Sequence, residues 1–219
     1  MRRLEPHSRE WYARQAWERG GYFHPWKRTL DGPEPESTFN SLLESLIGPT
    51  ARVLEAGCGH GPDAARYAAQ VARWTAYDRQ PELLELARRN APEAHLALWD
   101  GRGSIPAALA GPFDLIVSRR GPTSIVPHLA VLAAEGARFL YVGPGLDVPQ
   151  IGRRLNDVGW VVLGEWRERA RAWLPTEADY RLRCEFMNMT PDPDLWQREA
   201  SGRGLPYFEE RHTLLAAAE

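Results

Sequence analysis

The chain has 219 residues and a formal net charge of −2, so it is long enough to bury one core without disulfides or metals and has no overall positive charge that would attract nucleic acid. Its two cysteines, Cys58 and Cys184, form neither a CxxC pair nor a disulfide framework, and no apolar run reaches the roughly 18 residues that a membrane span needs. The first residues lack the apolar stretch of a signal peptide, so we expect a cytoplasmic protein with no membrane partner. We expect it to be a monomer or a homodimer.

Two helices are predicted ahead of the first strand. Residues 6–19 read as an aromatic, charged helix, and a second helix is expected to begin with Ser37 as its N-cap. An aromatic and then proline-rich connection lies between them. We therefore expect residues 1–48 to form a helical lid and residues 49–219 to form the main domain.

From residue 52 onward, short apolar runs alternate with helical stretches, which is typical of successive βα units and a parallel sheet. The predicted strands are, in chain order, 52–55, 74–77, 95–99, 113–117, 137–142, 159–166 and 207–215. The predicted helices begin at Pro62 and at Pro81 and cover 125–134 and 148–157. Residues 176–204 are expected to be an irregular helical insertion before the last strand, with 180–189 as an alternative last strand.

A glycine-rich turn, Gly57-Cys58-Gly59-His60-Gly61, joins the first predicted strand to the first helix. Side chains at these positions would keep a ligand from lying against the backbone, and glycine removes that obstacle. A glycine-rich turn alone is a weak signal, because many such loops are ordinary tight turns. The acids that follow the next two strands give it weight.

Asp78 and Asp100 follow the second and third predicted strands, at the same edge of the sheet as the glycine turn. In nucleotide-type sites of doubly wound sheets, an acid in the position of Asp78 accepts hydrogen bonds from the ribose hydroxyls. Asp100, beside Gly101, is placed to accept from the exocyclic amine of an adenine. The alternatives are a helix-capping role for Asp78 and a turn role for Asp100.

The segment Val53-Leu54-Glu55-Ala56-Gly57-Cys58-Gly59-His60-Gly61 closely resembles motif I of the class I S-adenosylmethionine (SAM)-dependent methyltransferases, and later landmarks follow in the right order at Tyr77-Asp78, Trp99-Asp100, 113–118 and 135–140. The resemblance covers about residues 50–145. It implies a three-layer, Rossmann-like α/β fold with a seven-stranded, mostly parallel sheet of order 3-2-1-4-5-7-6 and an antiparallel strand seven. It also implies SAM as cofactor, with the motif I glycines beside its amino-acid part.

The competing interpretation is a dinucleotide-dependent oxidoreductase, which shares the order of strand, turn, helix and acid. Its fingerprint is Gly-x-Gly-x-x-Gly, whereas the glycines of this turn are spaced by two, and Glu55 before the first glycine also favours SAM. The candidate cofactor-binding residues are Glu55, Gly57, Cys58, Gly59, Gly61, Asp78, Arg79, Asp100, Gly101 and Ser118.

The loop after the fourth predicted strand usually faces the acceptor in this family, which nominates Ser118, Arg119, Arg120, Thr123 and Ser124. The two arginines would clamp a carboxylate or phosphate, or alternatively cap a helix or pair with a surface acid. This loop lacks the Asn-Pro-Pro-Tyr pattern of the amino-methylating families, which argues against N6 methylation of a base.

Aromatic side chains crowd the N-terminal segment, where related enzymes build a lid over the acceptor. They would desolvate the site and stack a planar substrate, or they would simply pack a helix onto the sheet edge. His24 among them is the candidate acid or base, against a structural role. Both cysteines are expected to be structural, and the spacing of the histidines predicts no metal site.

The leading hypothesis is methyl transfer to a small-molecule acceptor, because the charge is near neutral and no RNA-binding appendage follows the methyltransferase motifs. One alternative is an RNA methyltransferase, suggested by arginine-rich stretches such as 167–171. The other is a non-catalytic module that binds SAM.

Overall fold

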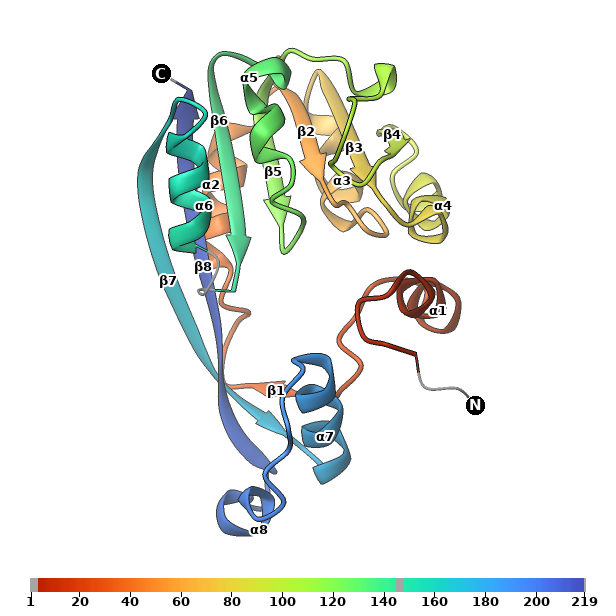
Figure 1. Cartoon of the computed structure of the whole chain (residues 1–219), viewed down its shortest axis with the longest axis vertical. Coiled ribbons are helices and arrows are strands. Elements are labelled where there is room, and N and C mark those ends of the chain that lie inside the picture. Colours follow the sequence, from red (N-terminus) through yellow and green to blue (C-terminus); the bar gives the residue numbers. More distant parts are fainter. Residues whose placement is uncertain (1–3, 145–147, 219) are drawn as a thin grey trace.

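A mixed sheet forms the centre of the computed structural model, which describes residues 4–144 and 148–218. Its eight strands lie in the order β1-β7-β8-β6-β5-β2-β3-β4 (Figure 1). They span Thr29–Leu30 (β1), Arg52–Ala56 (β2), Arg73–Asp78 (β3), His95–Leu98 (β4), Phe113–Arg119 (β5), Ala133–Gly143 (β6), Trp160–Leu174 (β7) and Leu205–Ala218 (β8). Strands β2 to β6 pair in parallel, whereas β8 pairs antiparallel with β6 and β7, and β1 pairs antiparallel with β7.

The helices begin and end where local chemistry favours it. They span Arg9–Arg19 (α1), Ser37–Leu46 (α2), Pro62–Tyr67 (α3), Pro81–Asn90 (α4), Leu129–Leu132 (α5), Val148–Asn156 (α6), Glu177–Phe186 (α7) and Leu195–Glu199 (α8). Ser8 caps α1 by accepting from the Trp11 amide at 3.1 Å, and Gly20 closes it with φ 67°. In the described part of the chain, none of the helices has the length and apolar character that crossing a bilayer requires.

The sheet confirms the predicted strand order once β1 is set aside. The count differs because β1 is an eighth strand of only two residues, Thr29 and Leu30, which pair with Trp173 and Ala172. A two-residue strand leaves no alternating pattern in the sequence, so it could not be predicted. The segment 180–189, the alternative last strand, is instead helical, as α7 shows.

Three predicted elements differ most in extent. The helix expected over 125–134 is a 3₁₀ turn at Val126–His128 followed by the short α5, because β6 already begins at Ala133. The strands expected over 159–166 and 207–215 are also longer than predicted. β6 pairs with β8 only from Arg138 to Gly143, and beyond Gly143 the strands β7 and β8 continue as a two-stranded extension.

The sheet is covered on both faces, which gives the expected three layers. α5 and α6 bury Leu129 and Ile151 on one face, whereas α2, α3 and α4 bury Leu43, Tyr67 and Leu84 on the other. The expectation that residues 1–48 form the lid therefore needs correction for α2, because its apolar face packs on the sheet as part of the main core.

A third apolar cluster lies beyond the carboxyl edge of the sheet. It joins Trp11 and Trp26 of the N-terminal segment to Leu174, Tyr180 and Phe186 of the β7–β8 insertion. Residues far apart in the chain thus form one substructure, which Figure 1 shows below the sheet. We call this the cap: residues 4–30 together with α7, α8 and the extended ends of β7 and β8.

Candidate active site

The glycine turn after β2 leaves open space at only one of its three glycines. Gly57, Gly59 and Gly61 all have positive φ angles, of 73°, 55° and 78°. A Cβ on Gly57 would overlap the ring of Pro122, and a Cβ on Gly61 would lie 3.1 Å from the Cβ of Ala87 in α4, whereas a Cβ on Gly59 would meet nothing within 4 Å. The expectation that the whole turn is bare for a ligand is therefore corrected, since two glycines make room for protein atoms.

Asp78 lies directly over this turn, at the end of β3. Its Oδ2 accepts from the Gly59 amide at 2.8 Å, and its Oδ1 accepts from the Gln80 amide at 2.9 Å. Burial raises the pKa of Asp78, and the two amides oppose that shift. Because each carboxylate oxygen can accept a second hydrogen bond, the acid can serve the turn and a ligand together.

The end of β4 provides a second corner of the site. The exposed Asp100 accepts a hydrogen bond from the Arg102 amide at 2.9 Å. This is the contact expected of a turn residue, the alternative to a contact with adenine. A Cβ on Gly101 would overlap Ser124 and would lie 3.1 Å from the Tyr77 hydroxyl. That hydroxyl is buried and has no hydrogen-bond partner among the described residues, and burial raises its pKa. The corner therefore holds a buried donor that a ligand could satisfy.

Two of the candidate cofactor residues point into the core instead. Glu55 shares a sheet face with Val53, and its Oε2 accepts from Trp74 Nε1 at 2.9 Å. Burial, with Asp63 next, raises the pKa of Glu55 well above its ordinary value. Cys58 is also buried, and burial raises the pKa of its thiol. Contact of these two residues with the cofactor stays a prediction; strand alternation turns the Glu55 side chain away from the open space at Gly59.

Replacing Glu55 with glutamine is expected to change how stability depends on pH. A carboxyl whose pKa is raised in the folded state contributes stability at low pH and loses it as the pH rises through that pKa. The amide oxygen of glutamine can still accept from Trp74, so the variant should lack that loss and exceed the wild type by about 1 kcal/mol at alkaline pH. Urea unfolding across a pH series measures this, with the exposed Glu44→Gln as control; parallel curves for wild type and Glu55→Gln would contradict the assignment.

The cap reaches the glycine turn through its N-terminal segment. Arg79 donates to the His7 carbonyl at 2.9 Å, and its guanidinium lies 5.1 Å from the ring centroid of Tyr12. The Tyr22 amide donates to Nδ1 of His60, inside the turn, at 3.3 Å. Arg79, predicted as a cofactor residue, thus anchors the cap beside Asp78.

Arg119, predicted to face the acceptor, is held in a buried polar network. Its guanidinium donates to Asp63 at 2.7 Å, to Glu36 at 2.6 Å and to Asn40 at 2.7 Å, and it lies over the ring of Phe39. These contacts tie β5 to α2 and α3. The contact of Arg119 with the acceptor stays a prediction, and its guanidinium nitrogens already have protein partners.

Arg120 has fewer partners than its neighbour. Its Nε lies 2.6 Å from Oε1 of Glu36, and its two Nη groups have no partner among the described residues. Glu36 also lies 3.4 Å from Nε of Arg211, whose Nη1 is 2.6 Å from Glu209. Glu209 in turn pairs with Arg28 at 2.9 Å. We call these five residues the arginine cluster.

The long antiparallel extension places this cluster over the carboxyl end of the sheet. Gly143, the last residue of β6, pairs with His212, so Arg211 and Glu209 lie just beyond the sheet edge. Both are buried, as is Glu36. Sequence reasoning missed these three residues. The available signal was the alternation in β8, where Glu209, Arg211 and Thr213 share the buried face.

His24 lies beside the arginine cluster. Its ring stacks on Trp26 with centroids 4.5 Å apart, and both ring nitrogens are buried without a hydrogen-bond partner among the described residues. Burial, then Arg28, lowers the pKa of His24 to about 4, so the ring is neutral near pH 7. That His24 and Arg120 both face the acceptor stays a prediction.

The other residues of the β5 loop are occupied by the protein itself. Ser118 is fully buried and its hydroxyl donates to the Pro122 carbonyl at 3.4 Å. Arg154 of α6 donates to the hydroxyl and the carbonyl of Thr123, and Ser124 donates to the Asp100 carbonyl at 3.1 Å. These residues shape the loop over Gly57, and the contact of Ser118 with a ligand stays a prediction.

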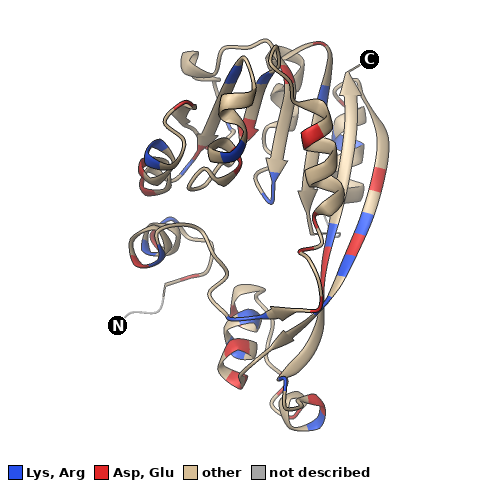
Figure 2. Cartoon of the chain, turned by 180° about the vertical axis from the view of Figure 1, so that it is seen from behind, with Lys and Arg blue, Asp and Glu red and all other residues tan. Residues whose placement is uncertain are grey.

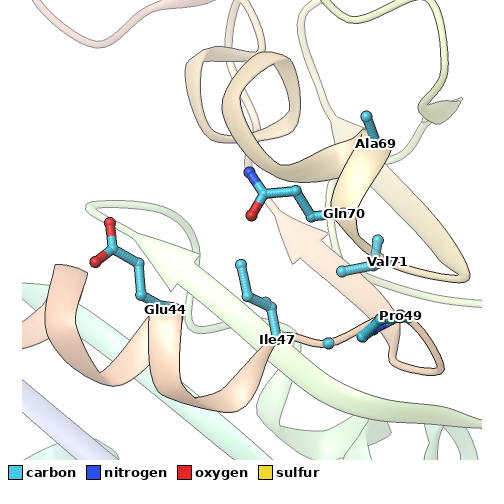
Figure 3. Close-up of a pocket in the computed structure, with 7 residues that line it drawn as sticks. Glu44, Ile47, Pro49, Ala69, Gln70 and Val71 are labelled. Carbon is cyan, nitrogen blue, oxygen red and sulfur yellow. The ribbon is translucent and has the colours of Figure 1, made fainter.

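A surface pocket lies at the opposite edge of the sheet and plays no part in this site. Its lining comes from the end of α2, from the connection between α2 and β2 and from the turn before β3, with Glu44, Ile47 and Gln70 among its residues (Figure 3). In the described ranges, no three His, Cys, Asp or Glu side chains gather as metal ligands.

The central part of the chain matches a known protein family. A family model described as a methyltransferase domain matches residues 53–143. This span runs from β2 to β6 and includes the glycine turn, Asp78 and the β5 loop, but not the cap. The cap therefore lies outside the part of the chain that the family model describes.

Longer matches extend over most of the chain. A protein-L-isoaspartate O-methyltransferase from Erwinia tasmaniensis is 30% identical over 152 residues, which cover 68% of this chain and 72% of the relative. The crystal structure of a functionally unknown protein from Deinococcus radiodurans R1 is 55% identical with a TM-score of 0.88, over 94% of this chain and 98% of that one. A SAM-dependent methyltransferase from Thiobacillus denitrificans in complex with S-adenosyl-L-homocysteine (SAH) shares the fold at a TM-score of 0.56 and 14% identity, over 98% of this chain and all of that one.

Other curated relatives are matched over less of their length. The chain spans 32% of a release factor glutamine methyltransferase and 56% of a further protein-L-isoaspartate O-methyltransferase.

Proposed function

This chain belongs to the class I SAM-dependent methyltransferases, and we propose that its acceptor is a small molecule held between the carboxyl edge of the sheet and the cap. It is an enzyme and its methyl donor is SAM. When bound, SAM supplies a methyl group that is already activated on a sulfonium centre. The chain's own residues must therefore orient the acceptor and exclude water.

The residues around the glycine turn fit SAM. Gly59 opens to free space, and the Asp78 carboxylate above it keeps acceptor capacity that suits two ribose hydroxyls. The unpartnered Tyr77 hydroxyl beside Gly101 is a donor that suits a ring nitrogen of adenine. We assign these roles to Gly59, Asp78 and Tyr77 as part of the proposal, with Asp100 at the exposed rim.

The observation that carries the small-molecule proposal is the cap. It covers the acceptor side with the buried side chains of Trp26 and Arg211 and with the half-buried ring of His24, and the ion pairs of the arginine cluster join it to the sheet. Such a covered, polar and aromatic site suits a compact ligand that is enclosed on binding. A folded protein substrate would need an open face.

An RNA acceptor is less well supported. Positive side chains do not form a continuous stripe, because along β7 they alternate with acidic ones, as Figure 2 shows. A protein acceptor is the second candidate, since the curated relatives include methyltransferases of proteins and release factors.

Two measurements test the proposal. Isothermal titration of the full chain with SAM and with SAH should show binding of both. Labelled SAM should then transfer its methyl group to the small-molecule pool of a cell extract and not to the protein or RNA pools. Label confined to protein or RNA would overturn the proposed acceptor, and absence of SAH binding would remove the proposed cofactor site.

A further inference from the structure

The arginine cluster and His24 together form a site whose ligand chemistry can be inferred. On its apolar side lie the stacked rings of His24 and Trp26, with the Phe186 ring 5.1 Å from Trp26. On its polar side lies Arg28, four residues after His24, which the shared carboxylates of Glu209 and Glu36 join to the guanidinium groups of Arg211 and Arg120. A ligand here meets flat rings and cations together.

The cations of this cluster are only partly neutralised by buried carboxylates. Three guanidinium groups share two buried carboxylates, those of Glu36 and Glu209. The remaining carboxylate partner, Glu34 on Arg28, is about half exposed. With Glu34 counted, three carboxylates balance the three guanidinium groups, and only the buried carboxylates number one fewer; a monoanion therefore disturbs the balance less than a ligand of higher charge.

Donor groups in the cluster are free to meet such an anion. The two Nη groups of Arg120 and the Nη2 of Arg211 have no partner among the described residues, although each arginine is fixed through its other nitrogens. A guanidinium that is fixed at Nε still presents a planar pair of N–H groups, which matches the two oxygens of a carboxylate. Neutral His24 adds one N–H donor.

We propose that this site takes an acceptor with a single carboxylate on a flat, apolar body, the carboxylate lying against Arg120 and Arg211 and the flat body against His24 and Trp26. This inference rests on the proposed function, because it names the class of the small acceptor. A cationic acceptor would be repelled by the three guanidinium groups. A phosphate dianion would add two negative charges to a cluster whose guanidinium groups and carboxylates are already equal in number.

Four matched probes test the charge preference on the full chain saturated with SAH: benzoate, the neutral benzamide, the cationic benzamidine and phenyl phosphate. Calorimetry should show benzoate binding at least about tenfold more tightly than benzamide, as expected for charge-assisted hydrogen bonds. Benzamidine should not bind measurably, and phenyl phosphate should bind more weakly than benzoate. Equal binding of benzoate and benzamide, or tighter binding of benzamidine or phenyl phosphate, would overturn the proposal.

Variants locate the preference within the site. Arg120→Gln should abolish the advantage of benzoate over benzamide and leave the affinity for SAH unchanged, because Arg120 is not among the proposed cofactor residues. Arg167→Gln, on the exposed part of β7, should keep that advantage. If Arg120→Gln retains it, the proposed ligand contact is wrong. If that variant loses SAH binding through misfolding, the comparison of benzoate with benzamide on the wild type decides alone, whereas failure of SAH to bind the wild type would instead contradict the proposed function.

Discussion

Replacing Arg119 with methionine is expected to lower the free energy of unfolding by about 3 to 5 kcal/mol, the cost of breaking a buried ion pair from one side. The Arg119 side chain is 18% exposed and its partner Glu36 is 3% exposed, so little water can replace the lost contacts. Methionine keeps an apolar stem over Phe39 but leaves Asp63 buried without its cation. Urea unfolding near neutral pH measures the loss.

A matched exposed pair and a double variant separate this effect from general loss of charge. Arg66→Met removes the partner of Glu44 at a position where the side chains are 61% and 49% exposed, so it should cost less than about 1 kcal/mol. Adding Asp63→Asn to Arg119→Met should recover part of the loss, because the uncompensated carboxylate disappears. Equal costs for Arg119→Met and Arg66→Met would show that the network does not tie β5 to α2 and α3.

The cofactor side of the site could be predicted from the sequence because its parts are local. A turn that follows a strand and an acid that follows the next parallel strand must meet at one sheet edge, whatever the rest of the chain does. The bond between the Gly59 amide and Asp78 is the direct result. The order of the seven longer strands was predicted from the family resemblance.

The roles of single residues within that frame could not be predicted, since they depend on contacts between distant segments. Gly57 faces Pro122 and Gly61 faces Ala87, so the spacing of the glycines reflects close packing as well as space for a ligand. Arg119 looked like an acceptor clamp, but its partners lie just ahead of α2 (Glu36) and in α3 (Asp63), and no local pattern reveals how these helices approach β5.

The acceptor side was the least predictable part, because its elements extend past the predicted limits. Three arginine-cluster residues lie on β8 beyond β6 and just ahead of α2, in stretches with no motif. The alternation of Glu209, Arg211 and Thr213 could have indicated a strand with a buried charged face. Charged side chains are rarely buried unless they are paired, and some ion-pair partners of these residues come from distant parts of the chain.

Replacing Asp78 with alanine is expected to weaken binding of SAM and SAH at least about tenfold and up to about a hundredfold, as charge-assisted hydrogen bonds to two hydroxyls are lost. Isothermal titration of the purified variant measures this. Asp114→Ala is the matched control, because this acid lies on β5 at the opposite edge of the sheet, paired with Arg52, and should leave the affinity unchanged. An unchanged affinity in Asp78→Ala would remove the ribose assignment.

The same acid also holds the Gly59 amide, so a loss of affinity alone does not show which bond matters. Comparing adenosine with adenine separates the two roles, since only adenosine carries the hydroxyls. If Asp78 binds the ribose, the alanine variant should lose its preference for adenosine while its affinity for adenine stays near the wild-type value. If Asp78 only shapes the turn, both ligands should weaken together, because the space above Gly59 would change for either one.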